Sequence, residues 1–490
     1  MRVRCLCFRI SHLLIWSVLL ASLADAQLTL RKISVDAFTN PDSQHKSIVE
    51  PDTYAWGSTI VSAFQVARIY GGGGADIGFA TTTDGGATWT RGYLPGLTHN
   101  YKGGPFSAAS DASVAFDAKH GQWLISALPL GNAADVSVSR SPDGITWGRP
   151  IPVDRSGGDD KNWIACDNTA TSPFYGNCYT VWDNPTIFMS TSSDGGLTWG
   201  SSKMTADRAS GSGGLPLVQP NGTVVVPIAG GNGLIAFTST DGGATWSRTT
   251  SISNVIEHGE QGGLRSAGLP GAEIDASGKI YVVWSDCRFR TSCNSNDLVF
   301  STSSDGKTWT SPSRIPIDDV SSTVDHFIPG IGVDPTTSGA TAHLALTYYY
   351  YPVSKCGNSC QLNVGFVTSD DGGNTWTAGQ QLAGPMQLTW LPNTFSGRMV
   401  ADYLSTSFVN GNAFGVFVVA GAPNGGVLNQ AVFTTATPLT APFDEPRFSS
   451  RIDKPVPNAK SDFQRKFYDD EWRFPIPKAH RVKPKESKVP

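Results

Sequence analysis

Short runs of alternating apolar and polar residues recur along the chain and predict a fold built from strands. One run covers Val114 to Asp117 and continues, after a turn, from Trp123 to Ser126. Similar pairs run from Glu273 to Trp284 and from Ile331 to Thr347. Alternation with a period of two is typical of half-buried strands. The pattern therefore predicts an all-β protein.

A short phrase, Ser/Thr-x-Asp-Gly-(Gly)-x-Thr-Trp, occurs six times and predicts a tight turn after a strand. The copies centre on Asp84, Asp143, Asp194, Asp241, Asp305 and Asp371. The aspartate can accept hydrogen bonds from its own turn, and the glycines can adopt a positive φ. The tryptophan offers a large apolar surface, which we expect to be buried between neighbouring units in every copy. The aspartates are expected to be structural.

Successive aspartates of the phrase are 59, 51, 47, 64 and 66 residues apart, the length of a four-stranded unit with variable loops. A further unit without the phrase runs from Val400 to Phe433. The phrase and its spacing resemble the Asp box (BNR repeat) of the sialidase-like β-propeller superfamily. The resemblance implies a propeller of six or seven four-stranded blades, with seven favoured, and box turns on the rim away from the central funnel.

Composition agrees with one large all-β domain and does not suggest a polyanionic partner. The 490 residues include 53 Gly and 14 Trp, the charged fraction is 16%, and the net charge is −4. We therefore expect no nucleic acid as a partner. The sequence leaves the oligomeric state open.

The two ends of the chain differ from its middle. Residues 1–26 combine early arginines, an apolar run from Leu13 to Leu20 and a small-residue cleavage site, which predicts a signal peptide and a secreted, extracellular protein with no membrane span. Residues 27–440 form the predicted propeller. Residues 441–490 are rich in Pro, Lys and Arg and are expected to be partly disordered, with Trp472 as the anchor of the tail.

The mature chain contains six cysteines in three sequence-local pairs. They are Cys166 with Cys178, Cys287 with Cys293, and Cys356 with Cys360. An oxidising compartment favours disulfides for these pairs. Zinc-ligand spacing is missing from the sequence, so we expect no metal, and no cofactor motif is present.

Ionisable and aromatic residues gather where the first strand of each unit begins, which predicts a ligand site in the central funnel. The segments include Glu50 to Asp52, Ser110-Asp111, Asp160-Lys161-Asn162-Trp163, Glu260 to Arg265, Asp325-His326 and Arg398 with Asp402-Tyr403. Such a composition suits a polar, hydroxyl-rich ligand such as a sugar acid or another glycan. Ion pairing between units is the structural alternative for each residue.

The family resemblance assigns roles to several of these residues. Sialidases use a Tyr activated by a Glu, an Asp as acid/base and three Arg that hold a carboxylate. Tyr403 and Glu273 resemble the nucleophilic pair, and Asp76 or Asp111 the proton donor. Arg265, Arg288 and Arg398 are the candidate arginines, with Asp160, Lys161, Trp163 and His326 as further substrate-binding residues.

The chain also departs from the family pattern, so three functions remain open. Glu50-Pro-Asp52 stands where the family carries its first Arg, which leaves the carboxylate clamp incomplete. The favoured hypothesis is that the protein is a secreted glycoside hydrolase acting on a terminal sugar, neutral or acidic. The alternatives are a propeller that binds glycans or proteins without catalysis, and a polysaccharide lyase that uses His326 or Tyr403 as base and Arg265 or Arg398 to neutralise a uronate.

Overall fold

Strands dominate the computed structural model, which describes residues 28–131, 134–266, 268–439, 446–450 and 454–456. Helix in these ranges is limited to four single 3-10 turns, η1 (Thr291–Cys293), η2 (Gly339–Thr341), η3 (Gly357–Ser359) and η4 (Leu388–Trp390). The prediction of an all-β protein is confirmed. Within the same ranges, every helix is too short to cross a bilayer. The predicted signal peptide and Trp472 lie outside the described residues.

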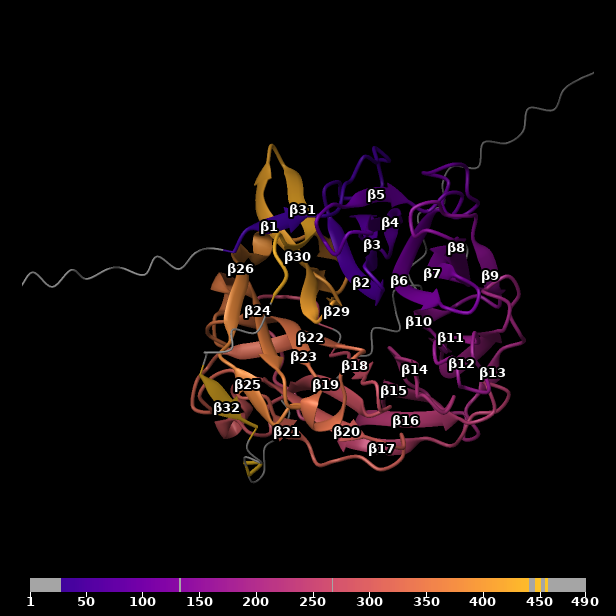
Figure 1. The fold of residues 1–490 in the computed structure, drawn as a ribbon. Coiled ribbons are helices and arrows are strands. Elements are labelled where there is room, and N and C mark those ends of the chain that lie inside the picture. Colours follow the sequence, from indigo (N-terminus) through magenta and orange to yellow (C-terminus); the bar gives the residue numbers. More distant parts are fainter. Residues whose placement is uncertain (1–27, 132–133, 267, 440–445, 451–453, 457–490) are drawn as a thin grey trace, which may run out of the picture.

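The strands pair into antiparallel four-stranded units, two of which join into an eight-stranded sheet (Figure 1). The eight-stranded sheet contains β2 (Ile48–Trp56), β3 (Thr59–Arg68), β4 (Gly74–Thr82) and β5 (Thr90–Tyr93), followed by β6 (Ala108–Asp117), β7 (Gln122–Leu130), β8 (Val136–Ser141) and β9 (Ile151–Asp154). Its halves are joined by strand pairing at one point, where Gly74 of β4 pairs with Ala109 of β6.

Four further sheets follow in chain order. They are β10 (Asp160–Cys166), β11 (Cys178–Asn184), β12 (Thr186–Ser192) and β13 (Lys203–Met204); β14 (Leu217–Val218), β15 (Val224–Gly230), β16 (Gly233–Ser239) and β17 (Thr250–Asn254); β18 (Gly271–Ile274), β19 (Ile280–Asp286), β20 (Asp297–Ser303) and β21 (Ser313–Arg314); and β22 (Asp325–Val333), β23 (Leu344–Tyr351), β24 (Gln361–Ser369) and β26 (Gln380–Gln387). A two-stranded ribbon, β27 (Asn393–Thr394) with β28 (Gly397–Arg398), comes next.

The last four-stranded sheet combines both ends of the described chain. The strands β29 (Ser405–Val409), β30 (Asn412–Asn424) and β31 (Val427–Thr435) are completed by the N-terminal strand β1 (Leu30–Lys32), which pairs antiparallel with β31. The first strands contact one another in the order β2, β6, β10, β14, β18, β22 and β29, and β29 contacts β2. These four-stranded antiparallel units are consistent with a propeller.

In every copy of the repeated phrase the aspartate accepts hydrogen bonds from its own turn, which is one residue shorter at Asp143 and Asp305. In the first, Thr82 Oγ1 donates to Asp84 Oδ1 (2.7 Å), and the Thr88 backbone N–H donates to the same oxygen (2.9 Å). The hydrogen bonds from Thr88 and Thr82 lower the pKa of Asp84 to about 2. Gly85 and Gly86 have φ of 67° and 93°, a region that favours glycine. All six aspartates are exposed or half-exposed on these turns.

The tryptophans of the phrase are not equally buried, so the prediction that every one is buried was wrong. Trp147, Trp246 and Trp376 are buried, whereas Trp89, Trp199 and Trp309 are half-buried. The difference depends on what covers each ring. Trp376 packs on Phe300 of the preceding sheet at 6.1 Å between ring centroids, and its strand β25 (Thr375–Thr377) is covered by β32 (Arg447–Ser449).

The strand β32 belongs to the segment predicted as a C-terminal tail. Besides the β25 pairing, Arg447 forms an ion pair with Asp370, and Trp376 Nε1 donates to Ser450 Oγ (3.1 Å). Further along, the Val456 N–H donates to the Arg288 carbonyl oxygen (2.8 Å). The described parts of this segment are therefore docked on the sheets.

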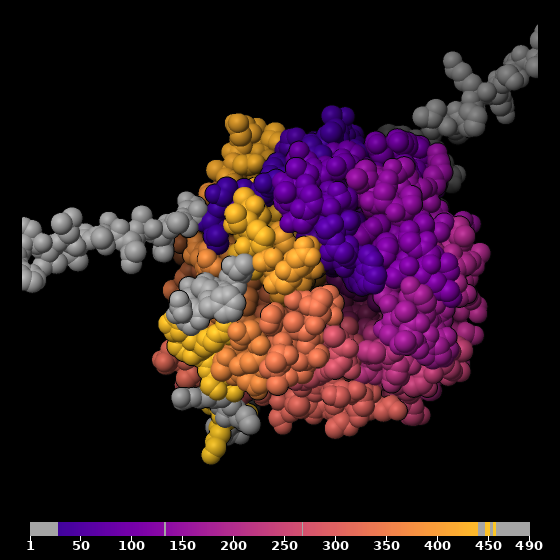
Figure 2. Space-filling view, in the orientation of Figure 1, coloured from indigo at the N-terminus to yellow at the C-terminus, as the bar shows by residue number. Residues whose placement is uncertain are grey.

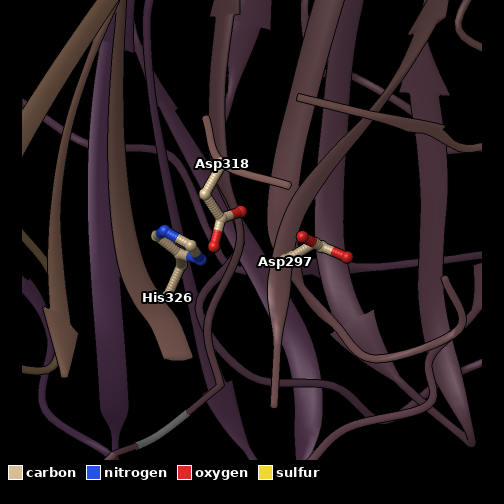
Figure 3. Close-up of side chains that lie close together, drawn as sticks. All are labelled: Asp297, Asp318 and His326. Atoms are coloured by element: carbon tan, nitrogen blue, oxygen red, sulfur yellow. The ribbon is translucent and has the colours of Figure 1, made fainter. Parts of the chain in front are cut away.

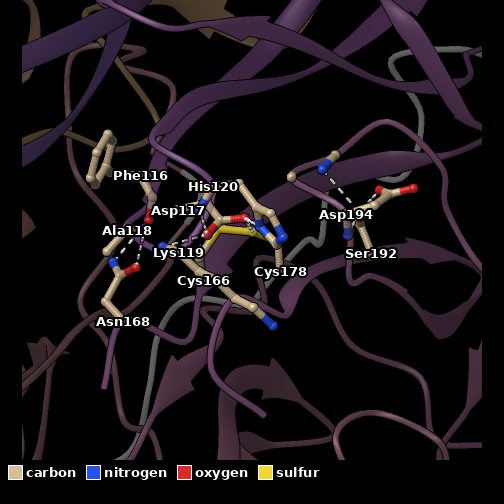
Figure 4. The surroundings of a disulfide bond; sticks show 12 residues. Phe116, Asp117, Ala118, Lys119, His120, Cys166, Asn168, Cys178, Ser192 and Asp194 are labelled. Carbon is tan, nitrogen blue, oxygen red and sulfur yellow. Dashed lines mark hydrogen bonds and ion pairs between the residues drawn. A yellow bond between two sulfur atoms is a disulfide. The ribbon is translucent and has the colours of Figure 1, made fainter. Parts of the chain in front are cut away.

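All three predicted disulfides are present, joining Cys166 to Cys178, Cys287 to Cys293 and Cys356 to Cys360. The first links β10 to β11 at directly paired positions, beside the turn aspartate Asp117 (Figure 4). Asp117 accepts hydrogen bonds from the Lys119 N–H (3.0 Å) and from His120 Nδ1 (2.6 Å). The disulfide therefore links two strands of one sheet, next to the turn that follows β6 of the preceding sheet.

Truncating a fully covered tryptophan should destabilise the protein more than truncating a half-buried one. We expect Trp376→Ala to lower the free energy of unfolding by about 3–5 kcal/mol, as removal of a buried aromatic ring does. Trp199→Ala should lower it by a clearly smaller amount, because part of that ring is already in water. Urea unfolding of both variants measures the difference; equal losses would contradict the packing described for Trp376.

Candidate functional site

Four first strands contain a β-bulge whose central residue has a left-handed backbone. These residues are Glu50 (φ 54°) in β2, Asp111 (φ 45°) in β6, Lys161 (φ 50°) in β10 and Ile328 (φ 49°) in β22. In each strand the pairing register shifts at that point. A positive φ is unfavourable for residues other than glycine, and bulges re-aim side chains. Three of the four residues are ionisable, so the bulges bring charge to the centre of the molecule.

An ion network centred on Asp402 joins four separate parts of the chain. Lys161 Nζ lies 3.0 Å from Asp402 Oδ2 and 3.4 Å from Asp111 Oδ1. Arg265, on the connection between β17 and β18, donates from Nε to Asp402 Oδ1 (2.8 Å) and from Nη2 to Asp402 Oδ2. All four side chains are buried. The bidentate geometry is the strong form of an arginine–carboxylate contact.

The network keeps Asp402 and Lys161 charged despite their burial. Burial alone would raise the pKa of Asp402, but Arg265 and Lys161 hold it well below its ordinary value. Burial alone would lower the pKa of Lys161, and Asp111, Asp402 and Glu50 hold it well above its ordinary value. Asp402 is therefore ionised, and Lys161 protonated, over the physiological pH range.

Glu50 lies beside this network, but unlike Asp402 it is protonated. Gln65 Nε2 donates to Glu50 Oε2 and to Ser110 Oγ (3.0 Å), and Ser110 Oγ donates to Asp111 Oδ2 (3.1 Å). Glu50 Oε1 is buried without a hydrogen-bond partner. Burial and then the neighbouring Asp402 carboxylate raise the pKa of Glu50 well above its ordinary value. Glu50 is therefore a buried, protonated carboxyl.

A small pocket opens next to the network. Its lining consists of Asp111, Lys161, Asn162, Trp163, Gly213, Leu215, Leu269, Pro270 and Tyr403. Its volume of about 20 Å³ is enough for one water molecule. Asp111 is the acidic residue of this lining, and Leu269 and Pro270 come from the connection that supplies Arg265. On the face shown in Figure 2, the surface is hollowed near its centre, where indigo, purple and orange parts of the chain meet.

Tyr403 forms one wall of the pocket together with Trp163. The two rings are 5.0 Å apart and inclined at 80°, and the Tyr403 hydroxyl donates to the Ala112 carbonyl oxygen (3.3 Å). Only 8% of Tyr403 is exposed. Burial, followed by the carboxyls of Glu50, Asp111 and Asp52, raises the pKa of the phenol well above its ordinary value. Tyr403 therefore keeps its proton when no ligand is bound.

The structure brings together one group of the residues chosen from sequence. Asp111, Lys161, Trp163 and Tyr403 line the pocket, and Arg265 lies behind it on Asp402. Asp160 precedes Lys161 in β10 and is buried.

Two of the candidate acids lie apart from this group. Asp76, in the third strand of its sheet, is fully buried and accepts a hydrogen bond from Thr98 Oγ1 (2.7 Å); burial raises its pKa to about 7. Glu273 is half-buried in β18, where burial and, less strongly, Asp52 raise its pKa to about 8. The carboxyls that act most on Tyr403 are instead those of Glu50 and Asp111.

The three candidate arginines do not share a ligand position. Arg265 holds Asp402, whereas Arg288 holds Asp286 through Nε (2.9 Å) and Nη2 (2.7 Å). Arg398 is half-buried and donates from Nη1 to the Leu391 carbonyl oxygen (2.9 Å). Each guanidinium thus has an acceptor within the protein.

His326 belongs to a different cluster, with Asp297 and Asp318 (Figure 3). Their candidate ligand atoms lie within 4.8 Å of one another. Two guanidinium groups already hold the carboxylates: Arg290 lies 2.5 Å from Asp297 and 2.7 Å from Asp318, and Arg314 lies 2.7 Å from each. Burial lowers the pKa of His326 to about 4. Two adjacent arginines oppose a cation here, so the cluster is an ion-pair network of the β18–β21 unit, with His326 of β22 beside it.

Sequence reasoning did not assign a role to Glu50, Gln65 or Asp402. Glu50 and Asp402 stand in the segments predicted to line the funnel, Glu50 also as the replacement of an expected arginine and Asp402 as the neighbour of Tyr403. Gln65 gives no signal in the sequence, because its position opposite Glu50 depends on the bulge between β2 and β3. The one clue in the sequence was the acidic residue Glu50 directly before a proline in a predicted strand.

Comparison with known proteins gives likenesses to solved structures. No family model and no curated protein matches the chain. A protein of unknown function from Dyadobacter fermentans has 15% identity and a TM-score of 0.43, over 70% of this chain and 99% of that chain. An ulvan lyase has 11% identity and a TM-score of 0.46, over 82% and 95%. An intramolecular trans-sialidase from Ruminococcus gnavus has 13% identity and a TM-score of 0.39, over 78% and 92%. Folds of this class carry many functions, so the chemistry rests on this chain's own residues.

Breaking the ion network should destabilise the protein strongly. Asp402→Asn leaves two buried cations without their shared carboxylate, and we expect a loss of about 3–5 kcal/mol in the free energy of unfolding. The matched control is Asp370→Asn, which breaks the exposed pair with Arg447 and should cost less than about 1 kcal/mol. Denaturant unfolding of both variants tests this; similar values would show that the Asp402 contacts do not support the fold.

Replacing Glu50 by Gln should stabilise the protein at neutral pH. Because its pKa is raised in the folded state, Glu50 favours folding below the pKa of the unfolded chain, and this contribution is lost as the pH rises toward the folded value. Glu50→Gln removes that loss, and its amide can pair with Gln65. We expect the variant to have a higher melting temperature than wild type at pH 7. This difference in melting temperature should disappear toward pH 4. A pH-independent difference would contradict a protonated Glu50.

Proposed function

We propose that the protein is a secreted glycoside hydrolase that acts on a terminal sugar, with its active site at the pocket formed by Asp111, Lys161, Trp163 and Tyr403. The observation that carries the proposal is the convergence on one pocket of the Asp111 carboxyl and the Lys161 ammonium, from the bulged strands β6 and β10, with the rings of Trp163 and Tyr403. Strain of this kind is common at functional sites. The carbohydrate-active enzymes named above act on glycans, which agrees with this substrate class.

Asp111 is the proposed proton donor, because it is the acidic residue of the pocket lining. It gives its proton to the departing oxygen as the glycosidic bond breaks, and recovers it from the water that completes hydrolysis. Lys161, 3.4 Å from Asp111, fixes the orientation of that carboxyl.

Tyr403 is the proposed nucleophile. Its phenol is protonated at rest, but the positive charge that develops on the sugar in the transition state lowers the pKa of a phenol placed beside it. Among the carboxyls that act on it, Asp52 can receive the proton, because burial raises its pKa only to about 7, whereas Glu50 is already protonated. In this scheme Asp52 takes the place of Glu273 as the base that acts on the tyrosine.

Binding without catalysis is the second candidate, and the small pocket favours it. A cavity of about 20 Å³ does not admit a sugar ring, so hydrolysis requires Leu269 and Pro270 to move. A surface-bound glycan would need no such movement. A lyase is less well supported, since His326 lies among Arg290, Asp297 and Asp318.

We further propose that residues 27–440 form one closed seven-bladed propeller, preceded by a signal peptide at 1–26 and followed by the segment 441–490. The order of contacts among the first strands and the addition of β1 to the last sheet support this count. Three disulfides fit an extracellular location.

Removing the proposed proton donor should abolish turnover with little effect on binding. We expect Asp111→Asn to lower kcat/KM on an aryl glycoside by about 10²–10⁴-fold, the usual contribution of a general acid. Tyr403→Phe should also prevent turnover and retain ligand binding. The matched control is Asp143→Asn on an exposed turn, which should leave both unchanged. Glycan binding by a wild type that hydrolyses no glycoside would support the binding candidate instead.

A further inference from the structure

We infer that the Tyr403 pocket takes an uncharged sugar and rejects sugar acids. The inference rests on the proposed function, because it names the substrate class of the same site. It follows from three features: where the cations of the region are engaged, which charges surround the phenol, and which side chains form the wall.

The cations next to the pocket are already engaged by carboxylates of the protein. Lys161 lies within 3.4 Å of both Asp111 and Asp402, and Arg265 holds Asp402 through two nitrogens. Its third nitrogen, Nη1, donates to Ser396 Oγ (3.3 Å). A sugar carboxylate would therefore have to displace Asp402 from a buried bidentate contact, which leaves that aspartate desolvated and unpaired.

The charge around the phenol also opposes an anion. Four carboxyl groups, those of Glu50, Asp111, Asp52 and Asp402, act on Tyr403. The two cations among them, Lys161 and Arg265, are both paired with Asp402, so neither is left to bind a sugar carboxylate. A cationic amino sugar is opposed by Lys161, whose ammonium lies at the pocket beside Asp111.

The wall of the pocket matches an uncharged ring. Trp163 and Tyr403 form an aromatic corner, and Leu215, Leu269 and Pro270 face it across the pocket. The C–H faces of a pyranose or furanose pack on such surfaces, while Asn162 and Asp111 offer hydrogen bonds to hydroxyl groups. Trp163 is half-buried, so part of its surface is available to a ligand.

Binding and turnover are measured separately on two sets of probes. The neutral set consists of the methyl and nitrophenyl glycosides of glucose, galactose, mannose, xylose, arabinose and N-acetylglucosamine. The acidic set consists of those of glucuronic, galacturonic and sialic acid. Calorimetry and saturation-transfer NMR report binding of the methyl glycosides, and release of nitrophenol reports turnover.

We expect at least one neutral glycoside to bind at least tenfold more tightly than every acidic one, with an affinity that does not change with salt. Trp163→Ala should abolish this binding, whereas Trp56→Ala, at an exposed ring outside the pocket, should not.

The outcomes separate this inference from the proposed function. Neutral binding without turnover supports the inference and contradicts hydrolysis. Turnover of a sugar acid at least as fast as of every neutral glycoside overturns the inference and leaves hydrolysis standing. Tighter binding of an acid, or no binding of any neutral probe, also overturns the inference.

Discussion

The shared carboxylate of Asp402 is the contact on which the centre of the molecule depends. It lies just before β29 and accepts Lys161 from β10 and Arg265 from the connection between β17 and β18. Three parts of the chain that are far apart in sequence are thus fixed at one point. Buried charges are tolerated only when they are paired and hydrogen-bonded, so each partner depends on the other two. Tyr403 follows Asp402 directly and is placed by the same contact.

The bulges and the ion network support each other. A left-handed backbone at Glu50, Asp111 and Lys161 is unfavourable by itself, and it persists only where surrounding contacts over-determine it. The contact of Lys161 with Asp402, and the hydrogen bond from Ser110 to Asp111, supply such contacts. The bulges in turn bring these side chains into reach of one another. The strained backbone at the bulges and the buried ion network therefore depend on each other.

The sequence predicted those features whose interacting residues lie close together along the chain. The turn around Asp84 was predictable because its acceptor, its donors and its glycines lie within a few residues. The three disulfides were predictable because each closes a short loop. The burial of Trp376 relative to Trp199 was not, since it depends on β32 arriving from the C-terminal segment. The separation of Arg265 and Arg288 could not be predicted either. Each guanidinium is held by a different carboxylate of the protein, and the sequence does not show which carboxylate that is.

The connection between β17 and β18 links the stability of the site to access to its pocket. Its first half is held at Leu264 and Arg265, where the Arg265 N–H donates to the Arg398 carbonyl oxygen (2.7 Å) and the side chain holds Asp402. Its second half reaches the pocket at Leu269, which packs against Gly213. Apolar packing of one side chain is weaker than a buried bidentate ion pair together with a backbone hydrogen bond. Widening of the pocket for the proposed ligand would therefore displace Leu269 first and leave Arg265 on Asp402, the contact that positions Tyr403.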